Sequence, residues 1–265
     1  MADNSAFVGE IPDYYDKGLG PNIFDYFGGV MAARVADDAP GNVLELAAGS
    51  GIVTRQLRDS LSRDVTVVAT DLNDAMLDVA RAKFTESDNV TFRVADAQDL
   101  PFADAGFDAI VCQFGHMFFP ERPRAYTEAR RVLRPGGRYR FSTWGRMEEN
   151  PFSEIVHMTM AEIFEGDPPG FYTVPFSLHD PEVILDELRA AGFADVEHTA
   201  ISHDKVVEDI PAFAAGLVFG NPSIHEVNER SGDAGAVRDE VAARLRARFA
   251  DGPMPLLSHH FVAYG

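Results

Sequence analysis

The chain has 265 residues, 46% of them hydrophobic, which is enough for one large α/β domain with a sizeable core. Its 42 Asp and Glu against 23 Lys and Arg give a formal net charge of −19, which argues against a nucleic-acid partner, because such proteins carry a basic patch. The single cysteine, Cys112, excludes an intrachain disulfide and a cysteine-based zinc site. No apolar run reaches the roughly 18 residues of a membrane helix, and no signal peptide is recognisable. We therefore expect a cytoplasmic protein without a membrane span.

A helix is predicted first, over residues 22–38, where it would cover one face of the fold. From 42 onward, short β-rich runs alternate with helical runs. Strands are predicted over 42–47, 64–70, 89–95, 107–113 and 137–144. The helical spacing between them lies at 51–62, 74–84 and 122–134. This alternation predicts βαβ units, a parallel sheet and right-handed crossovers.

The regular alternation of strands and helices ends after the fifth predicted strand. Residues 146–178 are rich in Phe, Met and Pro, and we interpret them as an insertion with one helix. A helix, a strand, an interrupted helical region and a closing strand follow. In chain order, the ranges predicted for the insertion helix and these later elements are 152–165, 181–191, 194–205, 208–250 and 259–264.

Two glycines, Gly49 and Gly51, lie between the first predicted strand and the helix after it. Glycine permits a tight turn and a close approach of the backbone to a ligand. The helix that follows presents its N–H groups and positive end to a carboxylate or phosphate. Taken alone, the pair is equally consistent with an ordinary strand-to-helix turn.

Acidic residues after the next two strands favour a binding site. Asp71 follows the second strand, 20 residues after Gly51, where a Rossmann-type site holds ribose hydroxyls. Asp96 follows the third strand and offers an acceptor to an adenine amino group, with apolar neighbours at 100–102 to sandwich the ring. A helix N-cap and a strand-end turn are the alternative interpretations. Three such signals at the carboxyl ends of successive strands match the crevice where these sheets bind ligands.

These segments, together with residues 131–137, resemble successive motifs of the class I S-adenosylmethionine-dependent methyltransferases. The resemblance is closest to the ubiquinone/menaquinone-biosynthesis C-methyltransferases (methyltransferase type 11), and it covers residues 40–145 well and the rest loosely. It implies an α/β, Rossmann-like seven-stranded sheet with helices on both faces, an antiparallel last strand and a helical lid or insertion. It also implies methyl transfer from S-adenosyl-L-methionine, leaving S-adenosyl-L-homocysteine, to an oxygen, carbon or nitrogen of a small molecule, and says little about which one. The Phe, Met and Tyr residues of the insertion, with residues 117–119, indicate a hydrophobic or aromatic acceptor, although such residues more often form core.

The resemblance also implies roles at the methionine end of the cofactor. Glu45 lies near the methionine amino group, and Ala47, Gly49 and Gly51 line the methionine part. Tyr15, in an N-terminal run that folds over the cofactor, touches the methionine carboxylate. Aromatic packing of an N-terminal arm is an equally good interpretation of Tyr15.

At the nucleoside end, the resemblance assigns Asp71 to the ribose and Leu72 to the adenine. Asp96 reaches the adenine N6, and Ala97 supplies a backbone contact. The other residues assigned to the cofactor site are Met76, Gln113 and Phe114, of which the last two lie beside the sulfonium. On this basis three parts are expected: an N-terminal helical cap over 1–40, the cofactor-binding core over 41–145, and the substrate side over 146–265.

One histidine is the candidate catalytic residue. His116 follows the fourth strand in an apolar loop, where the active centre is expected. An oxygen or carbon nucleophile of high pKa profits from a general base, and an apolar loop would lower the pKa of His116 toward the neutral form. The alternative is a histidine that only packs and hydrogen-bonds. No cluster has convincing metal-ligand spacing, so no metal is expected.

Two rival functions remain open at this stage. An NAD-dependent oxidoreductase would place a third glycine where Thr54 stands, and Glu45 in the strand also favours the methyl donor. A non-catalytic cofactor-binding protein of the same fold is the other. Helical insertions serve as lids or as interfaces, so a homodimer is one expected form. The expected partner is a small-molecule acceptor.

Overall fold

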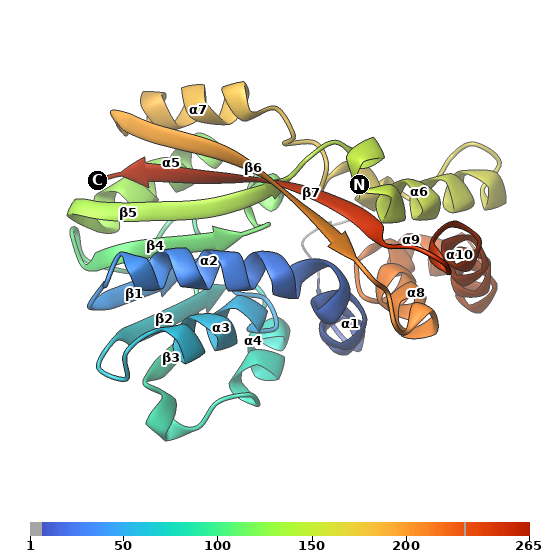
Figure 1. The fold of residues 1–265 in the computed structure, drawn as a ribbon, viewed down its shortest axis with the longest axis horizontal. Coiled ribbons are helices and arrows are strands. Elements are labelled where there is room, and N and C mark those ends of the chain that lie inside the picture. The colour runs from blue at the N-terminus through green and yellow to red at the C-terminus, as the bar shows by residue number, and fades with distance from the viewer. Residues whose placement is uncertain (1–6, 231) are drawn as a thin grey trace.

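The structure, a computed structural model, describes residues 7–230 and 232–265 (Figure 1). Its seven strands form one sheet in the order β3-β2-β1-β4-β5-β7-β6. Strands β1 to β5 pair in parallel, and β7 runs antiparallel between β5 and β6. The strands are β1 (Asn42–Glu45), β2 (Thr66–Asp71), β3 (Val90–Val94), β4 (Phe107–Gln113), β5 (Leu133–Trp144), β6 (Asp195–Lys205) and β7 (Met254–Tyr264). The predicted seven-stranded α/β sheet with an antiparallel last strand is thus confirmed.

Two cores lie on opposite faces of this sheet, because successive strand residues point to opposite sides. Val43 and Val111 pack with α2 (Asp25–Asp37) and α3 (Ile52–Ser60). The neighbouring Leu44 and Cys112 belong to the other core, which is covered by α5 (Arg122–Val132) and α7 (Pro181–Ala190). Helix α4 (Asp74–Arg81) follows β2 and contacts β2 and β3. The predicted helices on both faces are present.

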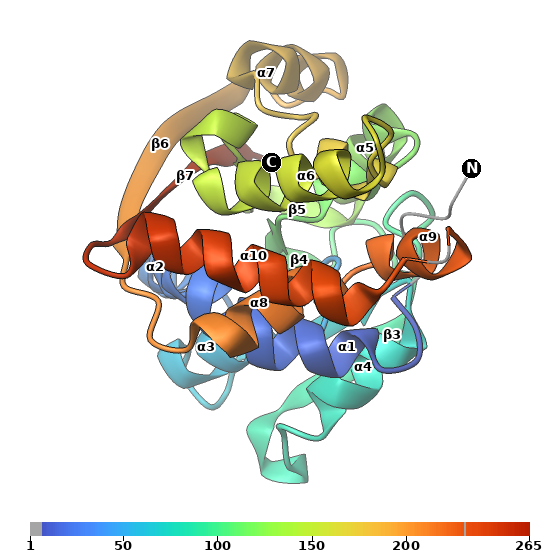
Figure 2. The same cartoon turned by 90° about the vertical axis from the view of Figure 1, so that its right-hand side faces the viewer.

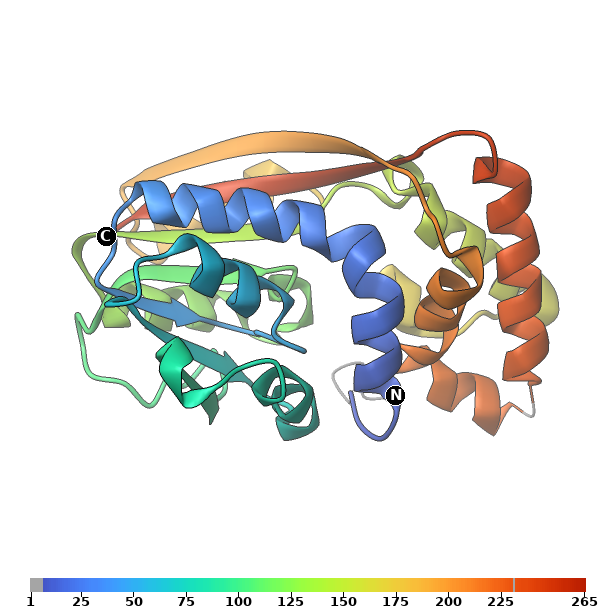
Figure 3. The ribbon, with the colours of Figure 1, turned by 60° about the horizontal axis from the view of Figure 1, so that its bottom comes forward.

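A cluster of helices lies beyond the carboxyl ends of the parallel strands (Figures 1 and 3). Figure 2 faces this cluster, in which α10 packs against α8 and α6. Strands β6 and β7 leave the sheet as a ribbon toward it. Its members are α1 (Ile11–Tyr14), η1 (Tyr15–Phe24), α6 (Pro151–Ile163), η5 (Gly170–Thr173), α8 (Ile210–Phe219), α9 (Ser223–Glu229) and α10 (Ala234–Phe249). Short 3-10 turns complete the chain at η2 (Glu86–Asp88), η3 (His116–Phe118) and η4 (Met147–Glu149).

The N-terminal segment differs from the sequence prediction. Residues Tyr15–Phe24 form a π-helix that continues into α2, so the helical run begins well before residue 22. In a sequence, Gly and Pro usually mark an interruption of a helix, and this segment contains Gly18, Gly20 and Pro21. In the fold, Gly18 crosses α8 so closely that a Cβ on it would lie 2.6 Å from the Cα of Gly216. A tertiary contact therefore decides this segment.

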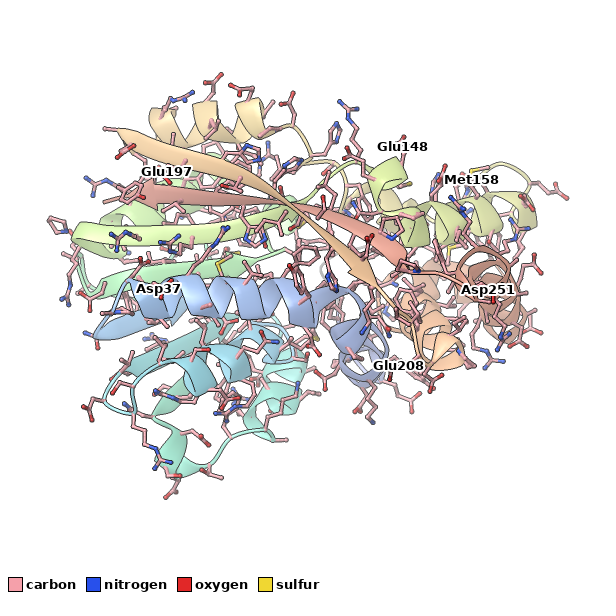
Figure 4. The ribbon with its side chains drawn as sticks, viewed as in Figure 1. Asp37, Glu148, Met158, Glu197, Glu208 and Asp251 are labelled. Atoms are coloured by element: carbon pink, nitrogen blue, oxygen red, sulfur yellow. The ribbon has the colours of Figure 1, made fainter. Side chains whose placement is uncertain are left out.

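Acidic side chains project around the periphery, among them Asp37, Glu148, Glu197, Glu208 and Asp251 (Figure 4). Within residues 7–230 and 232–265, no helix combines the length and the apolar content needed to cross a bilayer.

Candidate active site

A cavity of about 260 Å³ opens at the carboxyl ends of β1 to β4. The strand order runs outward in opposite directions from the β1–β4 pair, so this is the switch point at which open α/β sheets bind ligands. We call it the nucleotide cavity. It is lined by Phe7, Tyr15, Ala47, Gly49, Thr70, Asp71, Leu72, Asn73, Met76, Ala95, Asp96, Ala97, Gln98, Gln113, Phe114, Gly115, Phe118, Phe119 and Pro120.

The turn after β1 is tied to the end of β2. The backbone N–H of Gly49 donates to Asp71 Oδ2 at 2.8 Å, and the N–H of Asn73 donates to Asp71 Oδ1 at 2.8 Å. Asp71 is 8% exposed, and burial raises the pKa of its carboxyl group, whereas these backbone bonds lower it. The side-chain amide of Asn73 also donates to Oδ1, at the longer distance of 3.4 Å, whereas Oδ2 keeps a free lone pair, so the carboxylate is held in place and can still accept from a ligand.

Two residues at the cavity carry positive φ without being glycine. Ala47, after β1, has φ 51°, and Phe114, after β4, has φ 53°. Such backbone costs free energy, and it persists where the surroundings impose it, commonly at functional sites. Both residues lie at the switch point, where the two strand ends face the cavity.

The far end of the cavity is formed by the ends of β2 and β3. Leu72 is 56% exposed there, and Met76 is buried behind it. The carboxylate of Asp96 accepts a hydrogen bond of 2.8 Å from the N–H of Gln98 and lies at the exposed rim. Sequence reasoning missed Gln98 and Asn73. Each follows a strand-end aspartate by two residues, which is the spacing of an Asx turn and the signal that could have identified it.

A small side cavity of about 20 Å³ adjoins the first and is lined in part by Glu45, Tyr15 and Gln113. Glu45 is 2% exposed, and within the described part of the chain its Oε2 atom and the Oε1 atom of Gln113 have no hydrogen-bond partner. Burial raises the pKa of Glu45 to about 8. A volume of this size admits one small polar group. At that pKa the Glu45 carboxyl is protonated at neutral pH, and an ammonium group bound beside it would lower the pKa and favour the carboxylate. The unpartnered oxygens of Glu45 and Gln113 would then accept from that group, so these residues fit the amino end of an amino-acid ligand.

A third cavity, of about 70 Å³, lies next to the nucleotide cavity and is mostly aromatic. We call it the aromatic cavity. The two share Phe7, Tyr15, Phe114 and Phe118. Phe114 stacks on Trp144 with ring centroids 3.9 Å apart, and Tyr15 stacks on Phe24 at 5.0 Å. The remaining lining residues are Leu19, Ile23, Phe152, Phe171, Tyr172, Pro175, Phe176, Leu217 and Asn221.

Residues 43–137 match the model of a methyltransferase domain family. The chain is 36% identical over 174 residues to a demethylmenaquinone methyltransferase of Clavibacter sepedonicus, spanning 62% of this chain and 70% of that one. It is 30% identical over 170 residues to a ubiquinone/menaquinone biosynthesis C-methyltransferase of Proteus mirabilis, spanning 59% and 68%. The chain belongs to the class I S-adenosylmethionine-dependent methyltransferases.

A solved structure of the same fold is phosphoethanolamine N-methyltransferase 2 of Haemonchus contortus, with phosphomonomethylethanolamine and S-adenosylhomocysteine. Its TM-score to this methyltransferase is 0.61 at 18% identity, and the match covers 96% of this chain and 56% of that one. Because the chain belongs to this family, the methyltransferase uses S-adenosyl-L-methionine as methyl donor. Neither the oxidoreductase nor the non-catalytic alternative is favoured.

The structure brings ten of the predicted cofactor residues to the nucleotide cavity. They are Tyr15, Ala47, Gly49, Asp71, Leu72, Met76, Asp96, Ala97, Gln113 and Phe114. Glu45 lines only the side cavity. Gly51 lines none of the three cavities described, and its predicted role at the methionine part stays a prediction. Its φ is 80°, and a Cβ there would lie 2.8 Å from the Cβ of Ala80, so Gly51 permits close packing of the turn on α4.

The structure argues against the predicted role of His116 as general base. His116 lies in η3, where Gly115 and Phe118 face the nucleotide cavity but the imidazole points into the core. It is 0% exposed, and Nε2 is hydrogen-bonded to the hydroxyl of Tyr139. Burial, with a smaller contribution from Arg122, lowers the pKa of His116 to about 3. A neutral imidazole sealed from the cavity cannot take a proton from an acceptor, so the packing interpretation fits.

Proposed function

We propose that the aromatic cavity holds the methyl acceptor, and that the acceptor is a small, flat, uncharged aromatic molecule. The observation that carries this proposal is that Tyr15, Phe114 and Phe118 line both cavities, which therefore adjoin, so an acceptor in one would lie next to the methyl donor in the other. Donor and acceptor held in line gain the large effective molarity of a preorganised displacement, worth about 7–11 kcal/mol.

The proposed cofactor contacts follow from the cavity geometry. Asp71 accepts from the ribose hydroxyls through the free lone pair of Oδ2, and Leu72 with Met76 flanks the adenine. Asp96 accepts from the adenine amino group at the rim, beside the backbone of Ala97. The other proposed contacts are the turn residues Ala47 and Gly49, with Glu45, Gln113 and Tyr15 around the methionine end and Phe114 beside the transferred methyl group.

The cofactor supplies an activated methyl group on a sulfonium sulfur. An electron pair of the acceptor forms the new bond to the methyl carbon while the carbon–sulfur bond breaks, and the sulfur keeps that pair as a neutral thioether. An acceptor hydroxyl, amine or ring carbon then loses its proton. The protein's own contribution is to align the two molecules and exclude water. Burial raises the pKa of Tyr15, so its hydroxyl stays protonated and serves as a hydrogen-bond donor.

The composition and size of the aromatic cavity narrow the acceptor class. Among the described residues, no Lys, Arg, His, Asp or Glu lines it, which disfavours a phosphate-bearing acceptor such as the ligand of the nematode enzyme. The names of the bacterial relatives place them in quinone biosynthesis, which supports a flat ring. The volume is about 70 Å³, smaller than the roughly 150 Å³ of an engineered cavity that binds benzene. Even one ring therefore requires the aromatic side chains to move apart, and because a prenylated bicyclic acceptor would require a larger movement, we propose a single-ring acceptor.

The test is methyl transfer from S-adenosylmethionine to four acceptors: hydroquinone, catechol, a prenylated naphthoquinol and phosphoethanolamine. S-adenosylhomocysteine release and product mass are measured for each. We expect methylated hydroquinone or catechol, with little product from the other two. Turnover confined to phosphoethanolamine or to the prenylated naphthoquinol would refute the proposed acceptor class.

A further inference from the structure

We propose that Tyr172 and Asn221 form a specificity element that recognises a hydroxyl or amine hydrogen on the acceptor. This inference rests on the proposed function, because it assigns a polar contact within the aromatic cavity. Both side chains line that cavity and not the nucleotide cavity. They would therefore hold the part of the acceptor away from the methyl donor.

The two side chains share one backbone carbonyl. The Tyr172 hydroxyl donates to the carbonyl oxygen of Leu217, and Asn221 Nδ2 donates to the same oxygen at 2.6 Å. Asn221 Nδ2 also donates to the Tyr172 hydroxyl oxygen at 3.2 Å, and the N–H of Ser223 donates to Asn221 Oδ1 at 3.0 Å. Tyr172 is 3% exposed and Asn221 2%, so these bonds hold both groups rigidly.

The network fixes the orientation of the Asn221 amide. The N–H of Ser223 can only donate, so it requires the amide oxygen, and the carbonyl of Leu217 can only accept, so it requires the amide nitrogen. Every polar hydrogen of Tyr172 and Asn221 is thereby used within the protein. The hydrogen-bonding capacity that remains on Tyr172 Oη and Asn221 Oδ1 is therefore that of acceptors alone.

A polar site that can only accept hydrogen bonds favours ligand groups that carry a donor hydrogen and disfavours ligand groups that carry a negative charge. A hydroxyl or amine N–H of the acceptor can donate to it, whereas an ether oxygen or a carboxylate cannot. The other walls are Phe, Leu, Ile, Trp and Pro side chains together with Tyr15, whose hydroxyl is assigned to the methionine end of the cofactor, so a mismatched polar group beside Tyr172 and Asn221 loses its hydration without replacement. Sites that hydrogen-bond a ligand hydroxyl discriminate strongly against the analogue without it.

Asn221 also has a structural role, because its amide satisfies a carbonyl near the end of α8. Replacing Asn221 would therefore change both the stability of the fold and the binding of the acceptor, and the two effects could not be separated. Tyr172→Phe is the sharper change, since the ring stays in place and the Leu217 carbonyl keeps the Asn221 bond. Tyr126→Phe is the matched control, because Tyr126 is a fully buried tyrosine in the core beside His116, and it does not line the aromatic cavity.

The experiment compares two probes of similar size, hydroquinone and 4-fluorophenol, in which fluorine replaces one hydroxyl group and so removes one donor hydrogen. Dissociation constants are measured by calorimetry on protein saturated with S-adenosylhomocysteine, and kcat/KM is measured with S-adenosylmethionine. One hydrogen bond to a buried site is worth about a factor of ten in the hydroquinone to 4-fluorophenol ratio. We expect that ratio to fall to about two in Tyr172→Phe and to stay unchanged in Tyr126→Phe.

Three outcomes overturn the inference. Equal binding of the two probes by the unaltered protein would show that no donor is recognised. A tenfold preference retained in Tyr172→Phe, or lost equally in Tyr126→Phe, would assign the discrimination elsewhere. If neither probe binds or is methylated while S-adenosylhomocysteine still binds, the proposed acceptor class itself fails. That result is distinguishable from the first two, because in those the probes still bind.

Discussion

Asp71→Asn separates the structural role of this carboxylate from its proposed role in binding ribose. In the structure Asp71 accepts one hydrogen bond from the N–H of Gly49 and one from that of Asn73, each of 2.8 Å. An asparagine keeps one acceptor oxygen, so one buried N–H loses its partner. Hydrogen bonds to charged groups are worth about 1.5–3 kcal/mol, which sets the expected loss of unfolding free energy. Asparagine also removes the desolvation cost that raises the pKa of Asp71, so the expected loss of unfolding free energy lies near the lower end, about 1.5 kcal/mol.

Asp108→Asn provides a matched control at the other end of the strands. Asp108 Oδ2 accepts from the N–H groups of Gly41 and Asn42, each at 2.8 Å, and Asp108 does not line the nucleotide cavity. Both variants should lose stability in urea titrations, Asp71→Asn because one N–H loses its acceptor, and Asp108→Asn because its ion pair with Arg134 is removed while one amide oxygen can still accept from both N–H groups. Only Asp71→Asn should weaken S-adenosylhomocysteine binding by about 10–100-fold in calorimetry, because a charge-assisted bond to the ribose is lost. If the two variants bind the ligand equally well, Asp71 serves the turn and not the cofactor.

Two further changes test the close crossing of η1 and α8 and the role of the buried His116. Gly216→Ala would place a Cβ 2.8 Å from the Cα of Gly18, so we expect a loss of about 1–3 kcal/mol and a raised KM for the acceptor as η1 shifts. Gly252→Ala, with no atom within 4 Å of its Cβ, is the control, and identical behaviour of the two would contradict the close crossing. Because the pKa of His116 is lowered from 6.5 to about 3, the native state should lose stability as pH falls below 6.5, by up to about 1.4 kcal/mol per pH unit. His116→Phe should reduce that slope and keep kcat at neutral pH, and a fall in kcat at unchanged slope would restore His116 as a base.

The part of the site built from strand ends was predictable from the sequence. Gly49 and Asp96 follow short strands and Asp71 ends one, and the carboxyl ends of parallel strands meet at one edge of the sheet. Local pattern and topology together therefore determine where these residues lie. The predicted roles of individual atoms at these positions stay predictions.

Side-chain direction and long-range contacts were not predictable in this way. His116 and its neighbour Gly115 lie in the same turn, yet one faces the core and the other the cavity, and only the packing around Tyr139 distinguishes them. Tyr172 and Asn221 are 49 residues apart and meet only because the helical cluster folds over the sheet. Helical periodicity indicates such segments but does not say which residues meet. The homodimer, the cytoplasmic location and the three-part division of the chain stay predictions.

The most direct test of the account is a crystal structure of the protein with S-adenosylhomocysteine and hydroquinone. We predict that the adenosyl group lies between Leu72 and Asp96 with its ribose on Asp71, and that the sulfur lies beside Phe114. The ring should occupy the aromatic cavity, with one hydroxyl on Tyr172 or Asn221. A nucleoside bound away from the ends of β1 to β4, or a ring separated from the sulfur by the wall of Phe114 and Phe118, would contradict the central claim that the two adjoining cavities form one methyl-transfer site.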